Sequence, residues 1–173
     1  MLKVNWEKER ASALFCPKNN FLILEEMNHY KTIEILLVED NPNDIELTRR
    51  ALGKHNLLSK VHVVKDGEEA LDYIHCRNKY QGRDKSDLPK MVLLDLKLPK
   101  VDGMEVLREI RSNKNTQYLP VVVLTTSKSE SDVRESYRLG INSYIVKPVD
   151  YTKFVDAVAQ IGLYWLMMNE FPK

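Results

Sequence analysis

Three acidic side chains, one hydroxyl and one amine follow short apolar runs in this 173-residue chain. Glu39 and Asp40 come directly after the first run, and Asp95 comes after a later one. Thr125 and Lys147 follow two further runs. If the runs are parallel strands of one sheet, their carboxyl ends share an edge, and these five residues meet there.

The chemistry of such a group is that of phosphate. Three carboxylates in one cleft repel one another unless a cation neutralises them. Ligation by oxygen alone suits Mg²⁺, which keeps waters and phosphate oxygens as its other ligands. A hydroxyl and a lysine opposite the metal suit the oxygens of a phosphoryl group, whose transfer depends on positioning and charge neutralisation. Because a carboxylate is an established nucleophile for phosphate, the set predicts a site where an aspartate becomes phosphorylated.

The elements that would position these residues alternate along the chain from Thr32 onward. Five apolar runs of strand length occupy residues 33–38, 61–64, 91–94, 121–124 and 143–146. They are aliphatic on both faces, as expected when helices cover both sides of a parallel sheet. Five β-then-α units in a row predict an α/β fold, with a doubly wound five-stranded parallel sheet.

The segments between the runs have helical spacing. Pro42 suits the first turn of one helix, and the pairs Asp66-Gly67 and Asp102-Gly103 precede two others. A weaker fourth helix is expected to place Val133, Tyr137 and Leu139 on its apolar face. The longest helix, over residues 151–168, has an apolar stripe of Phe154, Val155, Val158, Ile161, Trp165 and Leu166.

Composition narrows the functional classes. Lysine and arginine number 26 against 25 acidic residues, so the net charge of +1 gives no reason to expect direct nucleic-acid or membrane binding. No apolar run approaches the roughly 20 residues that span a bilayer. Cys16 and Cys76 are too few and too far apart for a disulfide framework or metal knuckle. We therefore expect a cytoplasmic protein.

Four motifs together resemble the response-regulator receiver domain of two-component systems. They are LVEDN at residues 37–41, LDLKLP at 94–99 with Asp102-Gly103, LTT at 124–126 and YIVKP at 144–148. Their order and spacing are those of the family, and the resemblance spans residues 32–168. It implies the flavodoxin-like (βα)5 receiver fold. One motif alone would be weak, but four in order are specific.

The resemblance also implies a role for each matching residue. Asp95 resembles the phospho-acceptor, and Glu39 with Asp40 resembles the acidic pair that binds Mg²⁺. The backbone carbonyl of Lys97 would complete the metal ligands. The switch and phosphoryl-binding residues would be Thr125, Lys147 and Tyr144, and the bond from Lys147 to Pro148 would be cis.

Two positions depart from the common pattern. Lys97 stands where the family varies and where the side chain influences hydrolysis of the acyl phosphate. Thr126 stands where a smaller alanine is common, which bears on the swing of Tyr144. Neither residue removes a group that phosphorylation requires. Both leave open how long the phosphoryl group would last.

Weaker similarities point to single-domain regulators paired with bacterial phytochrome histidine kinases. They are the segments 41–44, 79–90 and 96–99 and the ending Tyr164-Trp165-Leu166. This resemblance implies a sensor histidine kinase, such as a phytochrome, as partner. Since only residues 169–173 follow the last helix in this sequence, we expect the signal to leave through protein contacts.

Other functions were weighed against this one. A phosphorelay shuttle stays open, whereas a phosphoaspartate hydrolase would need a second aspartate at position 97, where Lys97 stands. No glycine-rich phosphate loop follows the first run, which disfavours a nucleotide-binding module. A receiver that works without phosphorylation is disfavoured because all the required groups are present. We expect a phospho-acceptor rather than an enzyme acting on external substrates.

Three regions are predicted: an N-terminal extension over residues 1–30, the receiver domain over 31–168 and a tail over 169–173. Phe21 to Leu24 is the one compact apolar stretch of the extension and its expected anchor. The apolar stripe of the last helix exceeds what one face of a small sheet requires. An excess of this kind usually forms a contact surface, so we expect a homodimer.

Overall fold

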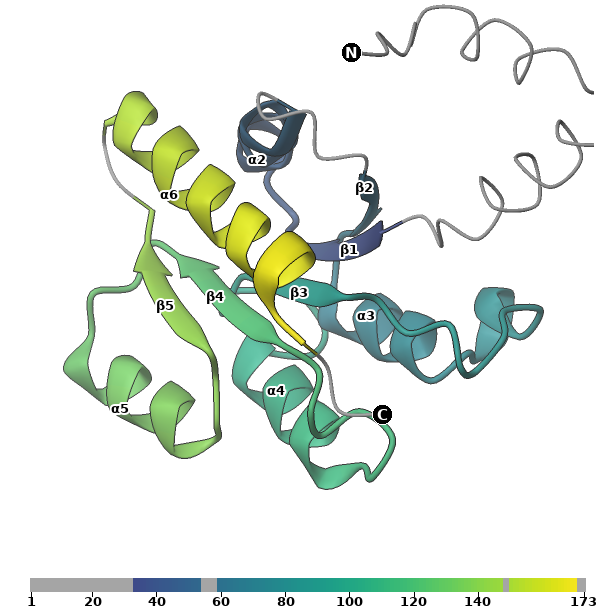
Figure 1. Ribbon diagram of the computed structural model, residues 1–173. Helices are drawn as coiled ribbons and strands as arrows, with labels where there is room; N and C mark the ends of the chain where they lie inside the picture. The colour runs from purple at the N-terminus through teal and green to yellow at the C-terminus, as the bar shows by residue number, and fades with distance from the viewer. Residues whose placement is uncertain (1–32, 54–58, 148–149, 171–173) are drawn as a thin grey trace, which may run out of the picture. The chain divides into compact units, whose positions relative to one another are not determined.

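The computed structural model describes residues 33–53, 59–147 and 150–170. Five parallel strands form one sheet in the order β2-β1-β3-β4-β5 (Figure 1). The strands are β1 (Ile33–Val38), β2 (Ser59–Val64), β3 (Met91–Leu94), β4 (Val121–Thr125) and β5 (Ser143–Val146). The order reverses between β1 and β3, which is where ligands bind in sheets of this kind.

Helices cover both faces of the sheet (Figure 1). They are α2 (Pro42–Gly53), α3 (Gly67–Ile74), α4 (Gly103–Ser112), α5 (Glu130–Arg138) and α6 (Tyr151–Leu163). One core cluster joins α2 and α6 to the sheet, and a second joins α3 and α4 to its other face. The predicted doubly wound α/β fold is confirmed.

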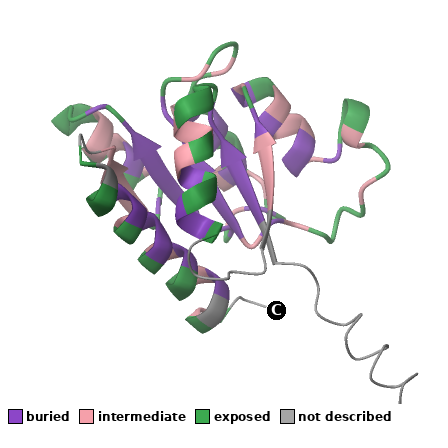
Figure 2. Cartoon of the chain, turned by 90° about the horizontal axis from the view of Figure 1, so that it is seen from above, coloured by how far each residue is buried: buried purple, intermediate pink, exposed green. Residues whose placement is uncertain are grey.

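The core lies in the three inner strands. Every residue of β3 and β4 is buried, because these strands have a neighbour on each side and helices above and below. Figure 2 shows the buried residues gathered in the inner strands and on the inward sides of the helices. The two edge strands are less buried: β5 is half-buried throughout, and Val61, His62 and Val63 of β2 are half-buried as well. The expectation of strands covered on both faces was therefore wrong at the two edges of the sheet.

Aspartate side chains cap the N-termini of three helices and set where these helices begin. Asp66 caps α3 by accepting from the backbone N–H of Glu69 at 2.7 Å, and Asp102 caps α4 through Met104 at 2.8 Å. Asp150 caps α6 in the same way through Thr152 at 2.9 Å. These caps fix the helix starts beside the carboxyl ends of the strands, where the predicted site lies.

Two expectations for the helices need correction. Tyr137 is 53% exposed, and the buried residue of α5 is its neighbour Ser136, so the predicted apolar face of this helix was wrong at Tyr137. Ser136 lies against α4, where its hydroxyl contacts the sulfur of Met104 at 3.4 Å. A small hydroxyl residue therefore occupies the inward position that an apolar pattern assigns to a large one.

The last helix differs from its predicted form at its end. The chain leaves α6 at Leu163 and continues as a π-helical turn, Tyr164–Met168. Phe154, Val158 and Leu166 of the predicted stripe are buried against the sheet and α2. The exposed apolar side chains of this region are others, namely Leu163, Tyr164 and Met168.

Several predictions lie outside the described residues. They concern the extension over residues 1–30, its anchor at 21–24 and the peptide bond to Pro148. Within the described part of the chain, no helix is long and apolar enough to cross a membrane.

Candidate functional site

The residues that follow β1 and β3 are held at one edge of the sheet by backbone hydrogen bonds. The N–H of Glu39 donates to the carbonyl of Val64 at 3.0 Å. The N–H of Asp95 donates to the carbonyl of Val38 at 3.0 Å, next to the switch in strand order. The backbone hydrogen bonding between strands therefore continues one residue beyond β1 and β3. It fixes the positions of Glu39 and Asp95 at the edge of the sheet.

Three carboxylates converge at this edge, as the sequence predicted. Oxygen atoms of Glu39, Asp40 and Asp95 all lie within 4.8 Å of one another. Glu39 and Asp95 are buried, with 1% and 7% of their surfaces exposed, whereas Asp40 is exposed. One side of the cluster is thus enclosed by protein and the other is open to solvent.

Lys147 joins these acids from the end of β5. Its Nζ donates to Glu39 Oε2 at 2.5 Å and to Asp95 Oδ2 at 3.0 Å. A third bond, at 2.8 Å, goes to Asp44 Oδ2 in the first turn of α2. Asp44 was not predicted as a site residue, although its place five residues after Glu39 puts it at the helix start beside the site.

Burial and the contact between Glu39 and Lys147 have opposite effects on the pKa of each group. Burial raises the pKa of Glu39 to about 7, although the hydrogen bond and charge of Lys147 lower it, and the charge of Asp95 raises it further. Burial lowers the pKa of Lys147, but its hydrogen bonds to Asp44 and Glu39 outweigh this and leave it raised. Lys147 therefore stays charged and balances the acids.

Thr125 and Tyr144 meet in a neighbouring hydrogen-bonded group built around Ser127. The Thr125 hydroxyl is buried and accepts from the N–H of Ser127 at 3.3 Å. Tyr144 donates to the Ser127 carbonyl at 3.2 Å, and the Ser127 hydroxyl donates to Asp132 at 2.6 Å. The two predicted switch residues are thus linked through Ser127, which the sequence analysis did not identify.

Lys97 approaches Asp95 through its backbone. Its N–H donates to Asp95 Oδ1 at 3.3 Å, while its side chain is exposed. Gly103 presses against the same loop, because a Cβ on it would lie 2.3 Å from the Asp95 carbonyl oxygen. Only glycine allows α4 to begin this close to the residue that follows β3.

The donor set fits a hard divalent cation. Carboxylate oxygens are the protein ligands of Mg²⁺, and the three acids offer one each at mutual distances that a single ion can bridge. The described cluster holds no histidine or cysteine, so it lacks the ligands typical of a zinc site. Chemically, the edge can hold one cation next to a buried aspartate that also faces an ammonium group.

A parallel sheet in this order, with acids at the switch point and a lysine opposite, defines a phosphate-handling α/β domain. Residues 35–159 match the family described as the response regulator receiver domain. The chain belongs to this family.

Two relatives, one of them with a solved structure, show where it lies within the family. The probable methanogenesis regulatory protein FilR2 of Methanothrix harundinacea is 44% identical, over 80% of this chain and 86% of its own. Response regulator Rcp1 of Synechocystis is 39% identical over 80% of this chain and 92% of its own. A solved structure of Rcp1 in a Mn²⁺-bound form, 36% identical, has a TM-score of 0.74 and covers 81% of this chain and 99% of that one.

The phosphorylated cyanobacterial phytochrome response regulator RcpA has also been solved. It is 39% identical, has a TM-score of 0.76 and covers 82% of this chain and 99% of that one. The chain is therefore a receiver homologous to phytochrome response regulators, and the predicted family, fold and signalling class are confirmed.

Proposed function

We propose that this chain accepts a phosphoryl group on Asp95 from the phosphohistidine of a sensor histidine kinase. The observation that carries this proposal is the position of the Asp95 carboxylate, which lies within 4.8 Å of oxygen atoms of Glu39 and Asp40 and accepts from the ammonium of Lys147 at 3.0 Å. A carboxylate oxygen of Asp95 bonds to phosphorus as the bond from phosphorus to the histidine nitrogen breaks, and that nitrogen keeps the electron pair.

Mg²⁺ is the cation proposed for the cluster. Glu39, Asp40 and Asp95 would hold it through carboxylate oxygens or bound water, and the carbonyl of Lys97 would supply a further ligand. When bound, the ion neutralises charge on the transferred group. When all three are ionised, the acids bring three negative charges to one edge, and the single charge of Lys147 balances only part of them.

The other residues act on the phosphoryl oxygens. Lys147 already bonds to Asp95 and would turn its ammonium to a phosphoryl oxygen. Thr125 would give up its contact with Ser127 to donate its hydroxyl to another, and Tyr144, bonded to Ser127, would respond to that movement. These roles of Thr125, Lys147 and Tyr144 are supported by the family match and by the contacts that connect them.

Incubation with acetyl phosphate tests the acceptor. With Mg²⁺, the protein should gain the mass of one phosphate, and chelation of the metal should prevent this. Asp95→Asn should abolish the gain, whereas Asp87→Asn, which removes an exposed acid outside the cluster, should leave it intact. Equal phosphate gain by Asp95→Asn would assign the acceptor to another residue.

The proposed partner is a phytochrome-type histidine kinase, supported by the likeness to the cyanobacterial phytochrome response regulator RcpA and by the sequence similarities above. Purified kinase carrying labelled phosphohistidine should transfer its label to this chain within seconds to minutes and should transfer none to Asp95→Asn. An unrelated histidine kinase provides the control. The encounter would take place in the cytoplasm.

We propose that the phosphorylated chain passes its signal on by contacting other proteins. It would not hydrolyse external phosphate esters, and it would not bind nucleic acid or membrane directly. A phosphorelay shuttle is the second candidate, and transfer of label from Asp95 to a histidine phosphotransfer protein would favour it.

We also propose a homodimer through the exposed apolar side chains at the end of α6, because Leu163, Tyr164 and Met168 are 46%, 51% and 71% exposed.

A further inference from the structure

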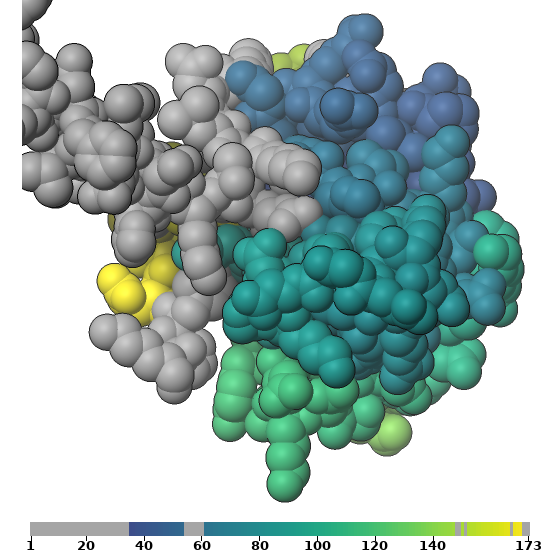
Figure 3. Space-filling view, turned by 90° about the vertical axis from the view of Figure 1, so that its right-hand side faces the viewer, coloured from purple at the N-terminus to yellow at the C-terminus, as the bar shows by residue number. Residues whose placement is uncertain are grey.

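A second hollow lies where α3 and α4 end. In a parallel βα sheet the helices run back against the strands, so their ends lie at the edge opposite the acids. The hollow has a volume of about 360 Å³ and lies between the segment that follows α3 and the turn that follows α4. Figure 3 shows α3 and its following segment, in teal, next to the green surface of residues after α4.

The charged residues that line this hollow are all basic. Arg77 and Lys85 line it together with the imidazole of His75, and no aspartate or glutamate does. Among the described residues, neither the guanidinium of Arg77 nor the ammonium of Lys85 has an ion pair or side-chain hydrogen bond. Burial lowers the pKa of His75, the charge of Arg77 lowers it further, and the opposing charge of Glu109 is a smaller effect.

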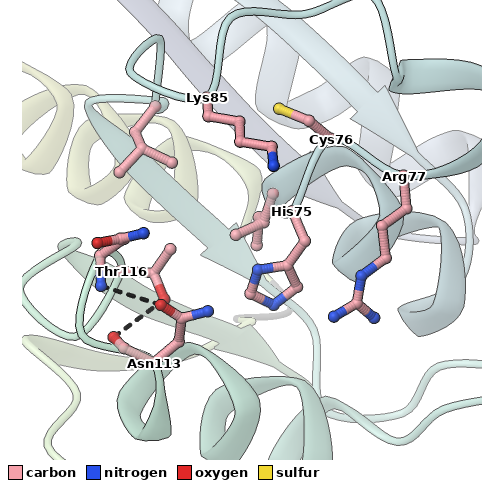
Figure 4. A pocket seen from close by; sticks show the side chains of 9 residues that line it. His75, Cys76, Arg77, Lys85, Asn113 and Thr116 are labelled. Atoms are coloured by element: carbon pink, nitrogen blue, oxygen red, sulfur yellow. Dashed lines mark hydrogen bonds between the residues drawn. The ribbon is translucent and has the colours of Figure 1, made fainter.

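The neutral lining also offers donors. The side-chain oxygen of Asn113 accepts from the N–H of Asn115 at 2.9 Å, which leaves the NH₂ group of Asn113 available. The ring of His75 has the one buried side-chain N or O atom, Nε2, that lacks a hydrogen-bond partner in the described part of the chain. Figure 4 shows Lys85 reaching toward the ring of His75, with Asn113 and Thr116 on the other side of the hollow.

Capping of the helix ends does not account for these groups. Basic residues after a helix often bond to its last carbonyls. Here the carbonyl of Tyr73 accepts from Cys76 and from Arg83, and that of Ile110 accepts from the hydroxyl of Thr116. The cations at the hollow are therefore not used to cap α3 or α4.

We propose that this hollow binds a small phosphate-bearing anion, such as a phosphate monoester. Two unpaired cations match the double negative charge of such a group, and the amides of Asn113 and Asn115 supply further donors. The volume is at the lower end of the range for small-molecule sites, which excludes a large cofactor. This site shares no residue with the acidic cluster.

Nuclear magnetic resonance of the full chain tests the proposal, with inorganic phosphate as the probe. Mg²⁺ is left out so that the acidic cluster does not recruit the anion, and chloride at matched ionic strength is the reference. Phosphate should shift the side-chain amides of Asn113 and Asn115 and the ring of His75 in a saturable way. Lys85→Gln should weaken the apparent affinity about tenfold, and Arg77→Gln should weaken it similarly.

Lys153→Gln is the matched control, because it removes another exposed lysine, from α6, and should change nothing. Lys85 is a surface residue, so its variant should fold. The proposal is overturned if phosphate gives no saturable shift at these residues. It is overturned equally if Lys85→Gln binds as well as the parent, or if the shifts concentrate around Thr125 and Lys147.

Discussion

At the scale of single residues, the ammonium of Lys147 holds the acidic edge together, because it bonds to Glu39, Asp44 and Asp95. Glu39 and Asp95 each follow a buried run directly, so the end of a strand locates them. Asp44 has no such signal, because an acid in the first turn of a helix is common for reasons of the helix dipole. Its bond to Lys147 joins α2 to the end of β5, and only the fold reveals that contact.

Asp44 should therefore contribute to stability without being an acceptor. Asp44→Asn removes a charged partner of Lys147, whose side chain is 8% exposed, and should lower the free energy of unfolding by about 1–2 kcal/mol. Urea unfolding with a metal chelator present measures this. Glu46→Gln breaks the exposed pair with Arg50 on the same helix and should cost at most about 0.5 kcal/mol. Equal losses in the two variants would show that the contact with Lys147 stabilises nothing.

At the scale of elements, the aliphatic runs located the strands to within two residues. The start of β2 at Ser59 was missed, since its pairing with Ile33 is set by the neighbouring strand and not by an apolar side chain. The prediction that Tyr137 faces inward was wrong because the inward residue of α5 is the small Ser136. A pattern of apolar residues does not detect a serine at that position. The pair Asp102-Gly103 predicted a helix start, but not how closely that start approaches Asp95.

Gly103→Ala tests this approach. The added Cβ would lie 2.3 Å from the Asp95 carbonyl oxygen and 2.6 Å from the Leu96 Cα, so the start of α4 must move. We expect a loss of about 1–3 kcal/mol in stability and slower phosphorylation by acetyl phosphate, because Asp95 moves with its backbone. Gly82→Ala, at an exposed turn with nothing within 4 Å, should change neither property. A Gly103→Ala protein as stable and as reactive as the parent would contradict the close packing.

At the scale of the whole molecule, the proposed homodimer would form through the end of α6. The sequence placed the excess apolar surface on Phe154, Val158, Ile161, Trp165 and Leu166. The sheet and α2 already bury Phe154, Val158 and Leu166, and Ile161 packs partly against the same core. What remains exposed is a smaller patch of Leu163, Tyr164 and Met168. Trp165 packs partly against the core and makes an edge contact with Tyr164, with ring centroids 5.1 Å apart. A charge at Trp165 would therefore disturb the fold as well as any interface.

Tyr164→Glu separates these effects, since Tyr164 is 51% exposed and lies outside both core clusters. In a two-fold dimer the same patch is buried on both copies, so one substitution places two like charges in the interface. Sedimentation at micromolar concentration should show a dimer for the parent and at least about tenfold weaker association for Tyr164→Glu. Tyr118→Glu, at a tyrosine that is 68% exposed elsewhere, should leave the dimer intact. A parent that stays monomeric before and after phosphorylation would rule the dimer out, and equal weakening by the two variants would move the interface away from α6.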